Sequence, residues 1–358
     1  MGRPHGIGIV GLGVISRAYL DVLAAHPDAR IVAVADLDAS RAAAVAAETG
    51  ARALTVEQLL ADPGVETVLN LTVPAAHAEI ALSAISHGKD VFGEKPLAAT
   101  LAEAKAVMDA AASAGRNVGS APDTVLGTGT QTARAAVDAG LIGRPTSALA
   151  TFVSPGHELW HPAPDFYYLG GGGPMLDMGP YYVSALVQIL GPVVSVIGAA
   201  SRTRDTRVIV SGPRAGEEIP VEVATHVTGV LEHSGGALST LTVSFDGVRT
   251  TAHPIEIHGE SGTILVPDPN TFDGDVKLLR TGDADWTTLE PSAGYVDGSR
   301  GAGLLDFTAG HRRASGELAY HALEIMEGVL RAAQSGCRVQ ITSAPERPMP
   351  VPLTPDWR

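Results

Sequence analysis

A glycine turn between a short apolar strand and a helix constrains the fold of this chain most. Residues 6–10 are apolar, Gly-Leu-Gly-Val-Ile-Ser follows, and a helical pattern continues to residue 25. Gly11 permits a tight turn, and the bare backbone at Gly13 lets a pyrophosphate approach the amides at the positive end of the helix. We expect cofactor contacts from Gly11, Gly13, Val14 and Ile15. Ser16 replaces the third glycine of this dinucleotide fingerprint, so the turn alone is weak evidence.

An acidic residue after the second strand strengthens this interpretation. The strand covers residues 30–35 and ends in Asp36, where a dinucleotide-binding fold places the acid that binds the adenosine ribose. A carboxylate accepts hydrogen bonds from the ribose 2′-OH and repels a 2′-phosphate, so Asp36 favours NAD over NADP. The alternative is that Asp36 caps the helix that begins near Ala39, although Asp38 or Ser40 can fill that role.

Strands and helices alternate through the first third of the chain. Further strands are expected at 52–54, 66–71, 89–93 and 116–119, with helices at 56–61, 74–86 and 100–114. This alternation predicts a doubly wound parallel sheet. We place the domain boundary after Pro122, which gives a dinucleotide-binding domain over 1–122 and a substrate-binding and oligomerisation domain over 123–358.

The fifth strand ends in Glu94-Lys95-Pro96, an acid, a base and a proline. Parallel sheets bind ligands at the carboxyl ends of their strands, so we interpret this tripeptide as an active-site corner; by itself it can also be a solvated turn. The fourth strand leads into Thr72 and Pro74, which we expect to contact the cofactor together with Glu94, Lys95 and Pro96; Pro74 also suits the start of a helix. His77 falls in the first turn of that helix, where it either touches the cofactor or only packs.

Composition limits the class of protein and its partners. The 358 residues suit two domains, and a formal charge of −14 without a basic run argues against nucleic acid or an anionic membrane as the main partner. One cysteine excludes an internal disulfide and fits a reducing compartment. We find no signal peptide, no 18-residue apolar run and no metal-ligand spacing, so a cytoplasmic protein without a metal is expected.

Strands follow strands in the second half of the chain. They are expected at 146–154, 193–200, 221–232, 237–245, 253–258, 263–266 and 276–280, after a helix near 130–139. This order predicts an α+β domain built on a large, mainly antiparallel sheet. A long helix closes the domain, and its apolar stripe of Leu318, Ala322, Ile325 and Val329 is expected to be core.

The loop from 154 to 173 is unusually aromatic in an aromatic-poor chain. It suggests a binding surface, and we expect at least one of Trp160, His161 and Tyr167 to line a substrate pocket; the alternative is a loop held together by its own aromatics. Asp177 and Tyr181 follow, four residues apart. They share a face if the helix has already begun, whereas Asp177 is merely the N-cap if it has not.

Together these segments resemble the glucose-fructose oxidoreductase / inositol dehydrogenase / MocA family of NAD(P)-dependent enzymes. The resemblance rests on the glycine turn, residues 70–74 with His77, Glu94-Lys95-Pro96 and residues 177–181. It implies a Rossmann domain and an open sheet whose exposed face builds dimers or tetramers. It also implies a cis Lys95-Pro96 bond, Lys95 near nicotinamide and substrate, Asp177 bonded to substrate hydroxyls, and an acid/base at Tyr181. Many members carry histidine at that last position, so the proton carrier is either Tyr181 or Lys95.

The resemblance predicts an NAD-dependent dehydrogenase that oxidises a secondary hydroxyl of a sugar, glycoside or cyclitol. One alternative is a glycosidase that uses tightly held NAD for transient oxidation and elimination. Another is a dinucleotide-sensing regulator without catalysis, but a sensor has no need of Lys95, Asp177 and Tyr181 together.

Overall fold

The computed structural model describes residues 3–355 and 357 and divides into two compact units. The first unit takes its described residues from Met1–Gly127, Tyr295–Tyr320 and Pro348–Arg358, and the second comprises Thr128–Gly294 and His321–Arg347. These units therefore differ from two consecutive domains divided after residue 122, because each unit contains more than one segment of the chain. Two later segments return to the first unit because they pair with it: Tyr295 forms β-bridges with Gly127 and Thr354, and Ser315 forms one with Gly119.

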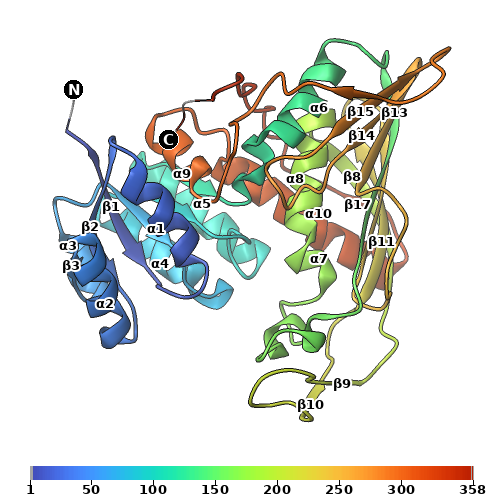
Figure 1. Ribbon diagram of the computed structural model, residues 1–358. Helices are drawn as coiled ribbons and strands as arrows, with labels where there is room; N and C mark the ends of the chain where they lie inside the picture. The colour runs from blue at the N-terminus through green and yellow to red at the C-terminus, as the bar shows by residue number, and fades with distance from the viewer. Residues whose placement is uncertain (1–2, 356, 358) are drawn as a thin grey trace. The chain divides into compact units, whose positions relative to one another are not determined.

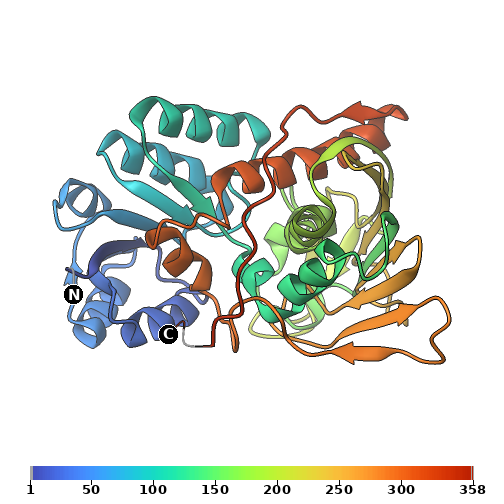
Figure 2. The same cartoon turned by 90° about the horizontal axis from the view of Figure 1, so that it is seen from above.

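The first unit is built on a six-stranded parallel sheet in the order β3-β2-β1-β4-β5-β6. Helices cover both of its faces (Figure 2), which confirms the doubly wound fold. The strands are β1 His5–Val10, β2 Ala29–Ala35, β3 Arg52–Ala53, β4 Thr67–Asn70, β5 Asp90–Gly93 and β6 Val118–Ser120; the helices are α1 Ser16–Ala25, α2 Ala39–Thr49, α3 Val56–Ala61, α4 Pro74–Ser86, α5 Leu101–Ala114 and α9 Ala302–Thr308.

Local signals fix the ends of these helices. Thr55 and Thr100 form capping boxes at the starts of α3 and α5. Asp38 caps α2 by accepting hydrogen bonds from the backbone N–H groups of Ser40 and Arg41. The starts of α2, α3 and α5 are thus fixed by residues next to their first turns. Because the strands are parallel, their carboxyl ends all lie at the same edge of the sheet.

The second unit contains a nine-stranded sheet in the order β16-β15-β14-β13-β7-β12-β11-β8-β17. Only β7 and β12 pair in parallel among its described strands, which confirms a mainly antiparallel sheet. Its strands are β7 Pro145–Val153, β8 Val193–Ser201, β11 His226–His233, β12 Leu238–Ser244, β13 Ile255–Gly259, β14 Gly262–Val266, β15 Val276–Arg280, β16 Thr287–Leu289 and β17 Val339–Gln340.

Helices of the second unit lie against one face of this sheet (Figure 1). They are α6 Thr128–Asp138, α7 Pro174–Asp177, α8 Gly179–Leu190 and the later part of α10 Gly316–Ser335. Two glycines allow α10 to approach closely: a Cβ at Gly198 or Gly229 would lie 2.4 Å from the Val329 carbonyl oxygen or 2.9 Å from Val329 Cγ1. The predicted stripe of α10 is buried, with Ile325 and Val329 both fully inaccessible.

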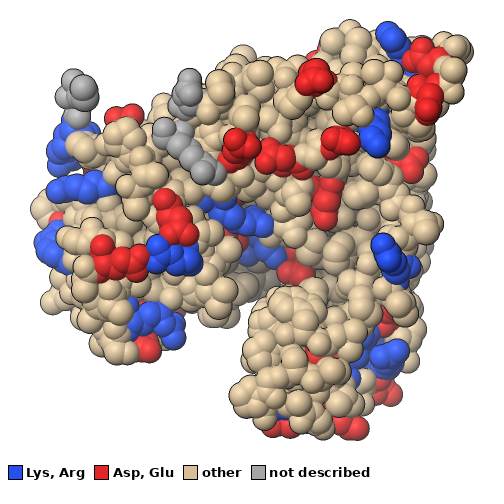
Figure 3. Space-filling model, viewed as in Figure 1, with Lys and Arg blue, Asp and Glu red and all other residues tan. Residues whose placement is uncertain are grey.

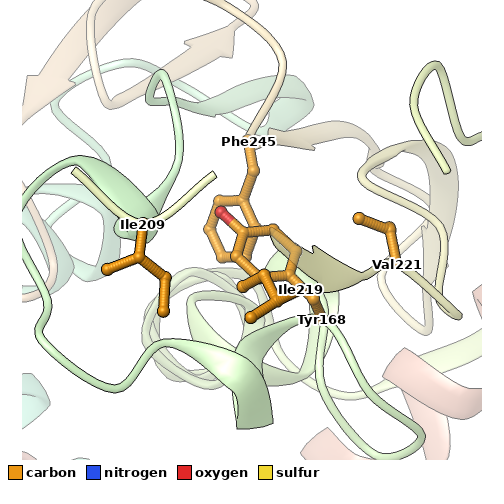
Figure 4. Close-up of a cluster of buried hydrophobic side chains, with 5 residues drawn as sticks. All are labelled: Tyr168, Ile209, Ile219, Val221 and Phe245. Carbon is orange, nitrogen blue, oxygen red and sulfur yellow. The ribbon is translucent and has the colours of Figure 1, made fainter. Parts of the chain in front are cut away.

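A small hairpin that the sequence analysis did not predict lies between β8 and β11. The strand expected at 221–232 begins only at His226, and the preceding residues belong to an excursion that contains the two-stranded sheet of β9 Thr206–Val208 and β10 Glu218–Pro220. This hairpin has its own apolar core. The core consists of Tyr168, Ile209, Ile219, Val221 and Phe245 (Figure 4). The excursion therefore holds the aromatic loop from 154 to 173 through Tyr168.

Candidate active site

The glycine turn of the first unit leaves room for a ligand. Gly11 has φ +91°, and a Cβ there would lie 2.7 Å from the Leu71 backbone, so only glycine fits. A Cβ at Gly13 would meet nothing within 4 Å. Ile15 stands at the N-cap of α1 without a side-chain cap, so the first amides of α1 lack the cap that would otherwise compete with an anion.

Asp36 lies beside this turn at the end of β2. One carboxylate oxygen accepts the Leu12 N–H at 2.7 Å and the other accepts the Asp38 N–H at 2.8 Å. Because Asp38 is the N-cap of α2, Asp36 is not needed for that role. Arg41 Nη1 lies 3.4 Å from Asp36, so a cation stands next to the acid that the sequence assigns to the ribose.

Large apolar side chains are exposed after three neighbouring strands of the same sheet. Val14 follows β1, Leu37 follows β2 and Val73 follows β4, and they are 99%, 103% and 67% exposed. Soluble proteins rarely gather such side chains at one edge without a partner. The open glycine turn, the Asp36 carboxylate and this apolar edge together fit a dinucleotide with a flat base.

Glu94 is anchored from two sides at the end of β5. Its Oε1 accepts the Tyr19 hydroxyl at 2.8 Å, and its Oε2 accepts the Lys95 N–H at 3.1 Å. Burial, followed by the Glu94 carboxylate, raises the pKa of Tyr19 well above its ordinary value, which keeps the phenol protonated as a donor. The Lys95-Pro96 bond is cis, as predicted. The acid of the corner thus supports the backbone from which the half-buried Lys95 projects.

His77 contacts both the loop that follows β4 and the loop that follows β5. It is 2% exposed, its Nδ1 lies 2.7 Å from the Pro96 carbonyl oxygen, and its Nε2 lies 3.0 Å from that of Thr72. Asn70 donates to the His77 carbonyl oxygen and accepts from the Thr72 hydroxyl. Pro74 begins α4, as expected. These contacts hold the loop in shape; both ring nitrogens face carbonyl oxygens, and a neutral ring donates its one N–H to one of them.

Sequence reasoning missed a buried carboxylate in the same unit. Asp123 is fully buried and accepts hydrogen bonds from the backbone N–H groups of Gly301 and Gly303 at 2.8 and 3.1 Å. Burial raises its pKa, while Arg300, 4.0 Å away, acts in the opposite direction. The two segments lie almost 180 residues apart, so no local pattern could pair them. Asp123 fixes the returning 299–303 segment onto the first unit.

In the second unit, Asp177 meets a histidine that the sequence analysis left without a role. His157 Nε2 lies 2.9 Å from Asp177 Oδ2, and the two side chains are only 9% and 16% exposed. Asp177 ends α7, and Met178 holds the N-cap position of α8, so Asp177 is not the N-cap residue. Tyr181 lies in the first turn of α8 and is 6% exposed.

Aromatic rings surround His157. Its ring centroid is 4.1 Å from that of Tyr167, 4.5 Å from that of Phe245 and 5.2 Å from that of Trp160. His161 and Phe166 extend this ring cluster through contacts of 5.3 to 5.6 Å. Trp160 and Phe166 stay 59% and 55% exposed. The loop is therefore both packed on its own aromatics and open at its edge, so the two alternatives left by the sequence are not exclusive.

A buried ionic network stabilises the aromatic loop of residues 154–173. Arg207 pairs with Glu158 at 2.7 Å and with Asp246, and Glu158 also accepts the Tyr168 hydroxyl. Arg207 and Glu158 are almost inaccessible, so each charge requires its partners. Gly156 lets them converge, because a Cβ there would lie 2.3 Å from Glu158 Oε2.

Within residues 3–355 and 357, no helix is long and apolar enough to cross a membrane. The same part of the chain contains no group of three His, Cys, Asp or Glu side chains arranged to hold a metal ion. Acidic and basic side chains are interspersed on the face shown in Figure 3.

Known proteins resemble this chain along most of its length. The model of an oxidoreductase family with an NAD-binding Rossmann fold, GFO/IDH/MocA, matches residues 5–121, and the C-terminal domain model of the same family matches residues 130–265. The dTDP-3,4-didehydro-2,6-dideoxy-alpha-D-glucose 3-reductase of Streptomyces antibioticus is 29% identical over 88% of this chain and 90% of its own length. The 1,5-anhydro-D-fructose reductase of Ensifer adhaerens is 27% identical over 93% and 98%.

Solved structures share the fold. An NAD binding oxidoreductase from Klebsiella pneumoniae superposes with a TM-score of 0.81 at 22% identity, covering 95% of this chain and 99% of its own. Both compact units therefore have counterparts in one known architecture; the first family model ends at residue 121, just after the first sheet, and the second begins at residue 130. This chain is an oxidoreductase of the GFO/IDH/MocA family.

Proposed function

We propose that this oxidoreductase transfers a hydride between NAD and the carbon of a secondary hydroxyl on a sugar, glycoside or cyclitol. The observation that carries the proposal is the Asp177 carboxylate, bonded to His157 at 2.9 Å beside a cluster of aromatic rings with exposed edges. A carboxylate accepts hydrogen bonds from hydroxyl groups, and aromatic faces cover the apolar side of a sugar ring. Names of relatives support this substrate class, since they include an inositol 2-dehydrogenase from Agrobacterium fabrum.

The first unit supplies the cofactor-binding residues. The amides around Gly13, Val14 and Ile15 would bind the pyrophosphate, and Asp36 would accept the ribose hydroxyls. Leu37 and Val73 offer apolar surface to the adenine. When bound, NAD supplies the hydride acceptor.

The remaining steps belong to the residues of this chain. Asp177 orients the substrate by accepting a hydrogen bond from a hydroxyl, with Trp160, His161 and Tyr167 at the rim. Tyr181 or Lys95 takes the hydroxyl proton as the hydride leaves. Glu94 supports Lys95 through the backbone contact at 3.1 Å.

We propose NAD rather than NADP as the preferred cofactor. The Asp36 carboxylate repels a 2′-phosphate, and its two backbone donors hold it in place. Arg41 weakens this repulsion because it lies 3.4 Å away at 49% exposure. Among the relatives, D-xylose 1-dehydrogenase (NADP(+)) 2 of Haloferax volcanii carries NADP in its name. We place the enzyme in the cytoplasm as a homo-oligomer.

A substrate panel tests the proposal. The purified protein is mixed with NAD and with myo-inositol, D-xylose, D-glucose or levoglucosan, and with NADH and 1,5-anhydro-D-fructose, while absorbance follows NADH. At least one polyol or keto sugar should change the NADH concentration, and simple alcohols such as 2-propanol should not. Equal rates with 2-propanol and with every sugar would contradict the substrate class. Cleavage of a glycoside without net NADH would instead indicate the eliminating glycosidase.

A further inference from the structure

We propose that His157 is a positioning residue for Asp177 and fixes the carboxylate that binds the substrate hydroxyl. The inference rests on the proposed function, because Asp177 must contact substrate for its orientation to matter. Its basis is the 2.9 Å contact between His157 Nε2 and Asp177 Oδ2, which joins the aromatic loop to the end of α7. The residues lie 20 positions apart in the sequence.

The chemistry of the pair assigns the donor. An ionised carboxylate only accepts hydrogen bonds, so the imidazole must donate through Nε2–H. His157 Nδ1 is buried and has no hydrogen-bond partner. A buried nitrogen without a partner is less costly as a bare lone pair than as an unsatisfied N–H. The ring therefore carries its proton on Nε2 and commits that proton to Asp177.

The surroundings of His157 hold the ring in one orientation. Tyr167 and Phe245 pack against it with centroid distances of 4.1 and 4.5 Å. Its backbone N–H donates to the Tyr168 hydroxyl at 3.0 Å, and Tyr168 is bonded in turn to the buried Glu158. A donor with so little freedom loses little entropy on bonding and transmits its own fixed position to its acceptor.

The consequence for Asp177 is geometric. A carboxylate has about four lone-pair sites, and one of them is directed at His157. The bond fixes the carboxylate plane and so the directions in which the other sites meet a hydroxyl group. Small errors in such directions are costly, because a displacement of about 1 Å can reduce the rate about 100-fold.

Two variants separate the donor from the packing. His157→Phe keeps an aromatic ring but removes the donor, and we expect it to lower kcat/KM by roughly 10- to 100-fold on the best panel substrate. His157→Gln retains an amide N–H near the position of Nε2 and should stay within about 3-fold of the parent by the same reasoning. His258→Gln is the matched control, since His258 lies on β13, where its Nδ1 contacts Thr263 and its Nε2 lies 3.9 Å from Glu256; its kcat/KM should equal that of the parent.

A double-mutant cycle distinguishes positioning from a general loss of stability. If His157 acts through Asp177, then His157→Phe combined with Asp177→Asn should be no slower than Asp177→Asn alone. Additive losses would overturn the proposal. Full activity of Asp177→Asn would instead show that the proposed role of Asp177 is wrong, which separates the failure of the two ideas.

The tautomer gives a test that needs no substrate. In protein labelled with ¹⁵N-histidine, the signals missing from His157→Gln identify His157. At neutral pH we expect a protonated Nε2 and an unprotonated Nδ1, and replacement of Asp177 by Asn should shift the Nε2 resonance. An unprotonated Nε2 would overturn the proposal even if His157→Phe failed to fold.

Discussion

In the proposed reaction, either Lys95 or Tyr181 takes the hydroxyl proton. An ordinary phenol has a pKa of about 10, so Tyr181 can act as a base near neutrality only if a cation stabilises its phenolate. Lys95→Met and Tyr181→Phe should each keep near-parental folding and NAD binding but lose at least about 100-fold in kcat. Steady-state kinetics with the best panel substrate, together with circular dichroism, measures both effects.

The extent of the loss in each variant identifies the proton carrier. The variant with the larger fall in kcat, and with a loss of the pH dependence that the parent shows, has lost the base. A Lys95→Met enzyme that retains more than about a tenth of the parental rate would mean that the corner after β5 is not catalytic.

Cofactor choice depends on one carboxylate and its neighbours. We expect NAD to bind at least about 10-fold more tightly than NADP, equivalent to about 1.4 kcal/mol. Asp36→Ser removes the negative charge and leaves Arg41 beside the ribose position, so it should narrow this preference or reverse it. Calorimetry with both cofactors measures the preference. Asp38→Ser keeps a residue that can cap α2 and should leave the ratio of NAD to NADP affinity unchanged. Equal affinities of the parent for NAD and NADP would contradict the assignment of Asp36 to the ribose.

At the scale of elements, the aromatic loop depends on one glycine. Gly156 has φ +110°, and an added Cβ would lie 2.3 to 2.7 Å from Glu158, Arg207 and Tyr168. Gly156→Ala should therefore cost about 2 to 4 kcal/mol by strain and by separation of the buried charges. Gly170→Ala is the control from the same loop, because a Cβ there meets nothing within 4 Å. Thermal unfolding measures the effect, and an equal fall in melting temperature in both variants would contradict this account.

A buried histidine makes the second unit sensitive to acid. His321 accepts the Val193 N–H through Nε2 at 3.0 Å and contacts Ser343 through Nδ1. Burial lowers its pKa to about 4, below the ordinary value of about 6.5. The unfolded chain thus binds more protons between these values, so the stabilising contribution is present above pH 6.5 and is lost as the pH falls toward 4.

The slope of stability against pH tests this directly. Between pH 7 and 5 the unfolding free energy of the parent should fall by at most about 1.4 kcal/mol per pH unit from this residue. His321→Gln should be less stable at pH 7 and show a shallower slope, whereas Gly170→Ala, which removes no titratable group, should match the slope of the parent. Parallel slopes in all three proteins would remove His321 as the cause.

Elements with a strong local pattern were predictable from the sequence. The helices expected at 56–61 and 100–114 and the apolar runs of the first sheet follow local patterns, and the structure confirms them. The hairpin of β9 and β10 was missed because its strands have three residues each, too short for periodicity to register. The contact of His157 with Asp177 was missed because tertiary packing alone brings these residues together.

For the whole molecule, fold class was predictable and chain routing was not. Alternating strands and helices imply a parallel sheet wherever they occur. By contrast, residues 295–320 and the described residues after 347 return to the first unit through contacts such as that of Asp123 with Gly301. Such pairings span the chain and leave no mark on local composition.

One face of the large sheet carries a row of side chains that suits a second copy of the chain. Strand register aligns Leu149 with Thr240, Thr240 with Val230, and Val230 with Ile197, across β7, β12, β11 and β8. Leu149 and Ile197 are 46% and 42% exposed, while their strand neighbours Ala148, Ala150 and Val196 are buried. The row therefore lies on the face opposite α10, and self-association through it removes apolar surface from water.

Light scattering after size-exclusion chromatography tests this oligomer. The parent should elute as a dimer or tetramer, and Ile197→Asp combined with Leu149→Asp should elute as a monomer, because like charges buried in such a contact repel and lack partners. Val248→Asp changes an equally apolar residue that is 87% exposed outside the strands and should leave the oligomer intact. A monomeric parent, or a row variant that still associates, would show that this face is not the interface.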